Sequence, residues 1–362
     1  MRAERYKSTA PIAQEWDDLA DRVHAVPWVR PGWIDAWWRA FGKGRTEIVA
    51  LRRDDRLAGV AAFARRNGAL VSPTNWHTPE FGLLAEDDQA MSELVASLWI
   101  SSPRSIHLSF LYPRRAEVAE CRAAARARGY RTIERVVLRS PYVRIEGDWD
   151  DHLARLDRHM LREISRCRRR LEEMGEVSFE LVDGTEDLDR FLEEGFQIED
   201  SGWKESHGTA IAAVPEVRQF YSEVAHWATS RGILRLAFLR LDRRPIAFDF
   251  NIEDDGVCYA LKGGYDDAYR KFGPGMMLTQ EMLKYAFVKR LRRYDFAGDV
   301  EGFKTEWTQS HNDRVRLQAF APSPPGLLEY AAFAYGRRLV KPVVNRLRTR
   351  YLNNSRFPLP SR

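Results

Sequence analysis

The fold is decided by the stretch Gly263-Gly264-Tyr265-Asp266-Asp267-Ala268-Tyr269-Arg270-Lys271-Phe272-Gly273-Pro274-Gly275-Met276-Met277-Leu278. A strand-like run at 257–262 leads into it, and a helix-like run at 276–289 leads out. Pro274 has no backbone N–H to lose, and its fixed φ suits the first position of a helix. Gly273 and Gly275 allow a tight turn and a close approach of a ligand to the backbone. The stretch therefore predicts a strand, a turn and a helix.

The turn also carries positive charge, in Arg270 and Lys271. N–H groups at the start of a helix point toward a bound anion, and the helix dipole favours negative charge there. A basic, glycine-rich turn between a strand and a helix therefore predicts a cradle for a pyrophosphate group. The alternative is an ordinary strand–helix turn whose two cations are solvated.

Length and composition point to a globular protein with two domains. The chain has 362 residues, which is too long for one ordinary hydrophobic core. Residues 1–8 contain no apolar segment of the kind found in signal peptides, and no apolar run reaches the length of a membrane span. Cys121, Cys167 and Cys258 are far apart and lack the spacing of metal ligands. We therefore expect a cytoplasmic location, buried thiols and no metal.

Positive charge is concentrated near the C-terminus. The net charge is +5, and eight bases but no acid follow Glu329, so the rest of the chain has a net charge of −3. A turn at 322–326 is followed by an amphipathic pattern over 327–350. We expect this basic helical tail either to pack against the body or to make a peripheral membrane contact.

The first part of the chain alternates helical and strand patterns. Helices are predicted at 11–23, 28–42, 88–99 and 116–128, and strands at 46–52, 57–65, 105–110 and 132–137. Within the second helix, Trp33, Trp37, Trp38 and Phe41 recur at helical spacing. This row favours a core stripe over the lining of a ligand groove.

Residues 150–175 predict a helical connection with two different faces. Its apolar positions are Leu153, Leu156, Met160, Ile164, Cys167 and Leu171, and its arginines are Arg158, Arg162, Arg166, Arg168, Arg169 and Arg170. A basic helix of this kind binds the phosphates of RNA, of a nucleotide or of an anionic surface. A solvated face, tempered by Glu163, Glu172 and Glu173, is an equal alternative.

The second part repeats the order of the first. Strands are predicted at 177–182, 233–241, 246–252, 257–262, 293–296 and 315–320, and helices at 186–199, 215–231 and from 276. Each half has helices, a hairpin and then alternating helix and strand, which predicts an α/β fold of two tandem sandwich domains with mixed central sheets. The expected domains are 1–149 and 150–321, followed by the basic helical tail at 322–362.

Several segments of the second half recur together in one family. They are Gly202-Trp203-Lys204, 233–236, 244–248, Lys262-Gly263-Gly264-Tyr265-Asp266, Tyr269, Pro274-Gly275, Tyr294-Asp295-Phe296, and Gly302-Phe303-Lys304 with Trp307. Through them the chain resembles the acyltransferase domain of CelD-like proteins of cellulose biosynthesis, a branch of the GNAT superfamily related to the FemABX peptidyltransferases. The resemblance covers about 150–320 and, more weakly, 33–63. It implies two tandem GNAT-like domains, of which the first is degenerate.

The resemblance also implies roles for individual residues. The turn would bind the phosphates of an acyl donor, acyl-CoA or acetyl-CoA, through Tyr269, Arg270, Lys271, Gly273, Gly275 and Met276. Pro274 departs from the usual Gly-x-Gly/Ala pattern of the GNAT loop. Lys304 resembles the lysine of the FemABX Phe-Lys segment, which lies close to the reacting groups. Trp203 and Lys204 would contact the acceptor.

Acyl transfer to an amine needs support for the carbonyl oxyanion and a path for two protons. Strand N–H groups near Gly263 and Gly264, where a bulge is expected, or the charge of Lys304 would support the oxyanion. Asp295, or Asp266 as second choice, would act as a base or hold the acceptor ammonium, and Tyr265 would protonate the leaving group. The structural alternatives are that Asp295 caps the turn at Gly298, that Lys304 pairs with Glu301 or Glu306, and that Trp203 lies in the core.

Together these features predict an N-acyltransferase that acts by direct attack within a ternary complex. The acceptor would be a small-molecule, saccharide or peptide amine, in cell-envelope or polysaccharide biosynthesis. One alternative is a FemABX-like peptidyltransferase that takes its donor from aminoacyl-tRNA bound along 158–170. The other is a non-catalytic accessory of polysaccharide assembly that docks through its basic tail.

Overall fold

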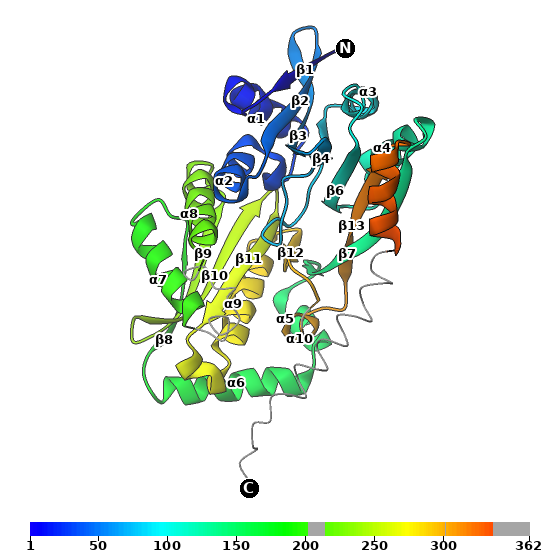
Figure 1. Ribbon diagram of the computed structural model, residues 1–362. Helices are drawn as coiled ribbons and strands as arrows, with labels where there is room; N and C mark the ends of the chain where they lie inside the picture. The colour runs from blue at the N-terminus through cyan, green and yellow to red at the C-terminus, as the bar shows by residue number, and fades with distance from the viewer. Residues whose placement is uncertain (202–213, 301, 336–362) are drawn as a thin grey trace, which may run out of the picture.

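The computed structural model describes residues 1–201, 214–300 and 302–335 (Figure 1). The strands are β1 (Arg2–Tyr6), β2 (Arg45–Arg53), β3 (Arg56–Arg66), β4 (Ala69–Val71), β5 (Leu84–Ala85), β6 (Ser105–Leu111), β7 (Arg131–Arg144), β8 (Val177–Val182), β9 (Leu234–Leu241), β10 (Arg244–Asp254), β11 (Val257–Tyr265), β12 (Arg293–Asp295) and β13 (His311–Phe320). The α-helices are α1 (Ala13–Arg22), α2 (Pro31–Phe41), α3 (Asp88–Leu98), α4 (Ala116–Ala127), α5 (Trp149–Arg155), α6 (Arg158–Glu172), α7 (Leu188–Asp200), α8 (Pro215–Ser230), α9 (Pro274–Val288) and α10 (Gly302–Thr305). Short 3₁₀ helices are η1 (Ala10–Ile12), η2 (Pro27–Val29) and η4 (Asp267–Phe272).

The strands form one mixed sheet in the order β1-β2-β3-β4-β6-β13-β7-β12-β11-β10-β9-β8, and β5 pairs with β3 off this path. Each half contributes a hairpin, β2–β3 and β9–β10, and one parallel pair, β4–β6 and β11–β12. The element types agree with the predicted order of helices, hairpins and strands. The predicted α/β class is therefore confirmed.

The two halves share strands at their junction. β7 pairs with β13 from Arg131 to Pro141 and then with β12 from Tyr142 to Arg144. This double pairing explains why β7 runs seven residues past the predicted end at 137. β13, the last strand of the chain, lies between β6 and β7 and so completes the sheet of the first half (Figure 1). The predicted domain limits at 149 and 321 stay a prediction, because the topology interleaves the two halves at these strands.

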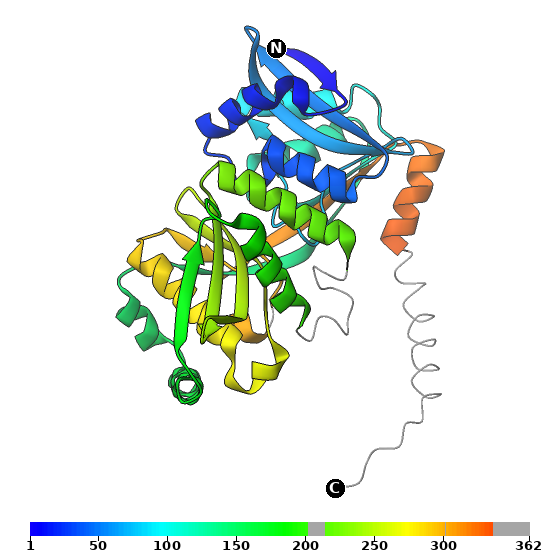
Figure 2. The same cartoon turned by 90° about the vertical axis from the view of Figure 1, so that its left-hand side faces the viewer.

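One hydrophobic core joins the halves. Trp33 and Trp37 of α2 are buried in the same cluster as Phe220 and Tyr221 of α8. Figure 2 shows α2 and α8 side by side between the two parts of the sheet. A Cβ on Gly32 would lie 2.1 Å from the Trp227 ring, so only glycine allows this approach. The tryptophan row is a core stripe, as predicted.

The C-terminal segment packs against the body where it is described. Residues 324–335 are helical, and Glu329 accepts hydrogen bonds from Arg104 and Ser105 on β6 and its flank. Phe333 packs against the rings of His107 and Phe320. The rest of the predicted tail, 336–362, lies outside the described residues. None of the helices in the described parts is both long and apolar enough to cross a membrane.

The three cysteines are free and buried, as predicted. Burial raises the pKa of each thiol, so none of them is poised as a thiolate.

Candidate functional site

The candidate site lies where β11 and β12 part. The two strands pair in parallel only from Val257 opposite Arg293 to Tyr259 opposite Asp295. β11 then continues to Tyr265 paired only with β10, whereas β12 ends at Asp295. Pairing with β10 shifts register, so that Leu261 is an extra residue on β11. The resulting bulge re-aims the part of β11 that lies beyond the last pair with β12.

This bulge, at Leu261, lies just before the two glycines, near which the sequence permits one. Gly263 and Gly264 pair regularly with Asp249 and Phe248. A Cβ on Gly264 would lie 2.8 Å from the Cα of Glu199, and one on Gly263 would lie 1.9 Å from a carboxylate oxygen of Asp249. Glycine is therefore needed at both positions, so that α7 and the Asp249 side chain can lie close to the backbone of β11.

The predicted turn forms the entry to α9. Gly273 adopts a left-handed conformation with φ of +60°, and Pro274 is the first helical residue, as the sequence indicated. No side chain caps this N-terminus, and its first turn contains no acidic residue. Arg270 and Lys271 at the end of η4 are exposed to solvent. The helix start and both cations thus lie at one turn, where Asp266 is engaged by the Ala268 N–H and by Arg244, and Asp267 is exposed to solvent.

Three further predicted residues build the walls of this turn. Asp266 caps η4 by accepting the N–H of Ala268 at 3.0 Å, and it pairs with Arg244 at 2.8 Å. The Arg244 guanidinium in turn lies 5.9 Å from the centre of the Tyr269 ring. A Cβ on Gly275 would lie 3.2 Å from the Tyr265 ring, so this ring covers the first turn of α9. Asp266 and Tyr269 therefore hold the turn in place, and Tyr265 is its nearest aromatic neighbour.

The basic helix α6 runs beside the turn (Figure 1). Its predicted apolar face is confirmed, because Met160, Ile164, Cys167 and Leu171 are buried. The Arg170 guanidinium lies 5.2 Å from the Phe272 ring of η4, and Arg168 pairs with Glu281 of α9. The exposed arginines are Arg158, Arg162, Arg166, Arg169 and Arg170. Helix α6 packs against η4, and the Cys167 thiol lies 3.9 Å from the backbone oxygen of Lys271, so these arginines lie on an element adjacent to the cations of the turn.

Asp295 is buried at the last position of β12, with 1 % of its surface exposed. Its Oδ1 accepts hydrogen bonds from Ser140 Oγ and from the Ala297 N–H, each at 2.9 Å. Its Oδ2 lies 3.6 Å from the Arg293 guanidinium. These contacts tie β12 to β7 and hold the turn that follows, which agrees with the structural alternative for this residue.

Lys304 is also buried, on the short helix α10. Its Nζ donates to the backbone oxygen of Asp299 at 3.2 Å and lies close to Gly298, where a Cβ would be 2.6 Å away. The ammonium is thus next to the loop that follows Asp295. The structure therefore brings Lys304 and Asp295 to the same end of β12, and places Tyr265, Asp266 and the turn at the far end of β11.

A buried charged pair lies on the other face of β11 and was missed by the sequence reasoning. Lys262 Nζ lies 3.1 Å from Glu199, which comes from α7 and is fully buried. His77, from the loop after β4, contacts the Tyr221 hydroxyl at 3.4 Å. Burial lowers the pKa of His77 to about 4, and the charge of Lys262 acts in the same direction. No local pattern could have found this group, because its members come from four distant segments.

Two predicted acceptor residues, Trp203 and Lys204, lie outside the described residues. Among residues 1–201, 214–300 and 302–335, no group of His, Cys, Asp and Glu side chains is arranged to hold a metal ion.

One family model matches the part of the chain that contains the candidate site. Residues 158–305 match the acetyltransferase (GNAT) domain model. The second half of the chain carries a GNAT-type domain. This GNAT-type segment holds the turn, α6, Lys262, Asp295 and Lys304. No curated protein matches the sequence.

Solved structures share the fold across most of the chain. FemX is 14 % identical with a TM-score of 0.59, over 89 % of this chain and 98 % of its own. The C-terminal domain (DUF2156) of a putative lysylphosphatidylglycerol synthetase from Agrobacterium fabrum is 13 % identical with a TM-score of 0.55, over 91 % and 97 %. A conserved protein of unknown function from Bacteroides thetaiotaomicron is 11 % identical with a TM-score of 0.53, over 79 % and 88 %. At these identities the likeness concerns the fold alone.

Proposed function

We propose that this protein transfers an acyl group from acyl-CoA to an amine acceptor. The observation that carries the proposal is the uncapped N-terminus of α9, with exposed Arg270 and Lys271 directly before it, inside a GNAT-type domain. An anion at such a helix start gains from the dipole and from both cations. The negatively charged pyrophosphate of coenzyme A is an anion of this kind.

The reaction itself would be a direct displacement. The acceptor nitrogen attacks the thioester carbonyl, a C–N bond forms, the C–S bond breaks, and the amine proton is lost while the thiolate is protonated. We assign protonation of the leaving thiolate to Tyr265, whose ring lies at the first turn of α9. Lys304 lies at the end of β12, away from Tyr265, so we assign its positive charge to the loop that follows Asp295 and not to the same thioester carbonyl. Asp295 positions Arg293 and the loop that follows β12, and Asp266 positions the turn.

The finer identity of the protein is part of the same proposal. We place it in the CelD-like branch, in the cytoplasm, with a saccharide or peptide amine as acceptor and with Trp203 and Lys204 on the acceptor side. The matched segments Lys262-Gly263-Gly264-Tyr265-Asp266 and Gly302-Phe303-Lys304 support this assignment.

One observation favours a second candidate. The exposed arginines of α6 continue the positive surface of the turn, and the two elements touch at Cys167 and Lys271. Coenzyme A needs only the turn, whereas a polyanion would occupy both surfaces. A transferase that uses aminoacyl-tRNA would therefore show binding that weakens steeply with salt, since each neutralised phosphate releases counterions.

The two candidates are separated by thermal melting with coenzyme A, acetyl-CoA, a long-chain acyl-CoA and an aminoacyl-tRNA in parallel. A ligand present at about 100 times its dissociation constant adds roughly 2.7 kcal/mol to the free energy of unfolding. A shift with a CoA species and none with tRNA supports the proposal. A shift with tRNA alone transfers the assignment to the second candidate, and no shift with any ligand contradicts both.

A further inference from the structure

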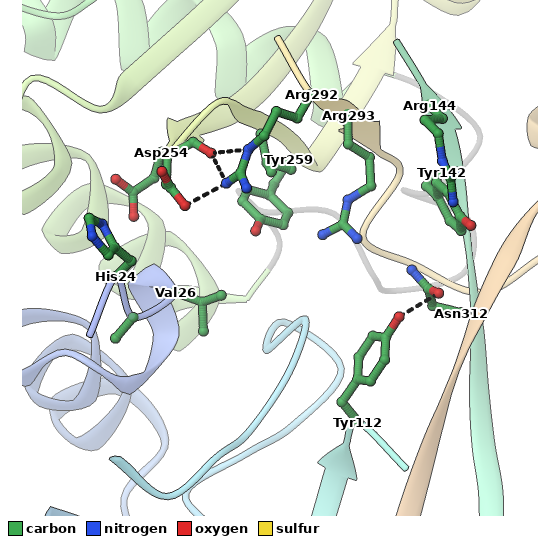
Figure 3. Close-up of a pocket in the computed structure, with 13 residues that line it drawn as sticks. His24, Val26, Tyr112, Tyr142, Arg144, Asp254, Tyr259, Arg292, Arg293 and Asn312 are labelled. Carbon is green, nitrogen blue, oxygen red and sulfur yellow. Dashed lines mark hydrogen bonds and ion pairs between the residues drawn. The ribbon is translucent and has the colours of Figure 1, made fainter. Parts of the chain in front are cut away.

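A pocket of about 440 Å³ lies between the two halves, at the opposite end of β11 from the turn (Figure 3). Its walls come from the end of α1, the β10–β11 turn, β11, β12, β7 and β13. The aromatic walls are Tyr112, Tyr142 and Tyr259, and the central cation is Arg293. No predicted cofactor-binding residue lines it.

Arg293 is held in the middle of these rings. Its guanidinium lies 5.6 Å from the centre of the Tyr142 ring and 5.9 Å from that of Tyr259. Behind it, buried Asp295 lies 3.6 Å from one guanidinium nitrogen. Asp295 is itself fixed by Ser140 and the Ala297 N–H. The position of the cation is therefore set by a rigid, buried carboxylate and not by the pocket surface.

Two donors in this region lack an acceptor. Arg293 Nε and Asn312 Nδ2 are both buried, and neither donates a hydrogen bond within the described part of the chain. The Tyr112 hydroxyl donates to Asn312 Oδ1 at 2.6 Å, which fixes the amide (Figure 3). Both nitrogens have almost no accessible surface, so a ligand in the pocket would meet the rest of the Arg293 guanidinium, because 26 % of this side chain is exposed. A guanidinium suits an oxygen anion.

The end of the pocket away from Arg293 carries acidic side chains. Asp254 and Asp255 lie there with His24, as Figure 3 shows for Asp254 and His24. Arg292 is committed to Asp255, whose backbone oxygen and carboxylate it contacts. An anionic group would be repelled from this end and drawn to the end that contains Arg293.

We propose that this pocket binds a phosphate or carboxylate attached to a planar ring or sugar. The anion accepts from the exposed part of the Arg293 guanidinium, and the ring lies against Tyr142 and Tyr259. An arginine suits this ligand because two parallel N–H groups of its planar guanidinium can donate to a carboxylate or phosphate, while the face of the guanidinium stacks on aromatic rings. Asp295 is a positioning residue for Arg293 in this arrangement. The site is separate from the acyl-donor turn and is tested without any acyl donor.

The test is a titration with phenyl phosphate, benzoate, inorganic phosphate and phenol, each followed by saturation-transfer NMR or calorimetry on the full chain. Phenyl phosphate or benzoate is expected to bind more tightly than phenol. Tighter binding of phenyl phosphate than of benzoate would indicate a phosphate ligand, and the reverse order would indicate a carboxylate. Arg293→Gln should weaken this binding by about tenfold to a hundredfold, as expected for loss of a charged hydrogen bond. The control Arg290→Gln removes an exposed guanidinium nearby in the sequence that does not line the pocket, and it should leave the affinity unchanged.

Further variants guard against a folding defect. Arg293→Lys keeps the charge beside Asp295 but loses the fork, so it should fold and still bind less tightly. Tyr142→Leu should weaken phenyl phosphate more than inorganic phosphate. Equal binding of phenol and phenyl phosphate, or equal losses in Arg290→Gln and Arg293→Gln, would overturn the proposal. A CoA-induced melting shift in the same variants reports separately on the donor turn.

Discussion

The two halves of the molecule contain the same unit with opposite electrostatics. In the first half, β5 and α3 lie between β4 and its parallel partner β6, and in the second half η4 and α9 lie between β11 and its parallel partner β12. The strand residue before each helix pairs near the start of the second hairpin strand, Ala85 with Gly59 of β3 and Tyr265 with Ala247 of β10, so the two helix starts are comparable. The start of α9 is the position at which the sequence predicted a phosphate cradle.

The start of α3 is already occupied by a carboxylate. Asp87 caps it by accepting the N–H of Ala90 at 2.7 Å, and Asp88 lies in the first turn. Arg53 pairs with Asp87 at 2.7 Å and with Glu86 at 2.6 Å. The hydrogen bonds from Arg53 and Ala90 lower the pKa of Asp87, which keeps the carboxyl charged.

The start of α9 has none of these features. Gly273 offers no side chain, and the nearby cations Arg270 and Lys271 are exposed. One half thus satisfies its helix dipole with its own anion, and the other leaves the dipole for a ligand. The comparison teaches that fold alone does not distinguish the two helix starts, whereas their caps do, and the uncapped start of α9 is the one that we propose as the donor site.

The largest effect is expected from reversing the charge of the turn. Arg270→Glu with Lys271→Glu should weaken CoA binding by about a hundredfold, because two charged contacts are replaced by repulsion. Calorimetric titration measures this change. Lys284→Glu with Lys289→Glu makes the same charge change on exposed positions of α9 away from the turn and should bind CoA normally. Similar losses in both double variants would indicate long-range attraction and no site at the turn.

The next effect concerns the core that joins the halves. Gly32→Ala places a Cβ 2.1 Å from the Trp227 ring and should lower the free energy of unfolding by about 1–3 kcal/mol through overpacking. Chemical denaturation measures the change. Gly302→Ala is the control, because no atom lies within 4 Å of its Cβ position. A variant Gly32→Ala as stable as wild type would mean that α2 and α8 are not held together by this contact.

A smaller effect is expected at the capped helix. Asp87→Ala removes the cap of α3 and should lower the free energy of unfolding by about 1 kcal/mol. It should not change the affinity for CoA or the number of CoA molecules bound. Asp88→Ala, one residue further on, removes an acidic residue that is not the cap and should cost less. A gain of CoA binding in Asp87→Ala would show that the two helix starts are interchangeable.

The last expected effect is a pH dependence at His77, a residue of the first half that contacts Tyr221 of the second. The pKa of His77 is lowered to about 4, whereas an unfolded histidine has a pKa of about 6.5. The unfolded state therefore binds more protons between these values, and the free energy of unfolding falls as the pH drops from about 6.5 to about 4. His77→Gln should remove this part of the slope in denaturation curves taken across this range. Parallel slopes in the two proteins would mean that His77 is accessible to protons in the folded state.

Much of the fold follows from local sequence patterns. The helices, both hairpins and the Gly273-Pro274 turn were predictable because periodicity, capping and fixed φ act over a few residues. The position of β13 between β6 and β7 was not, because strand pairing across the chain leaves no local signal. The same holds for the Lys262–Glu199 pair and for the contact of Asp295 with Ser140. The turn was therefore found from sequence, and the pocket at the other end of β11 needed the structure.

The most direct measurement compares amide hydrogen exchange at the two helix starts with and without CoA. The account predicts that CoA slows exchange at 273–277, the start of α9, and leaves 87–91, the start of α3, unchanged. Slower exchange at 87–91, or at neither segment when CoA is bound, would contradict it.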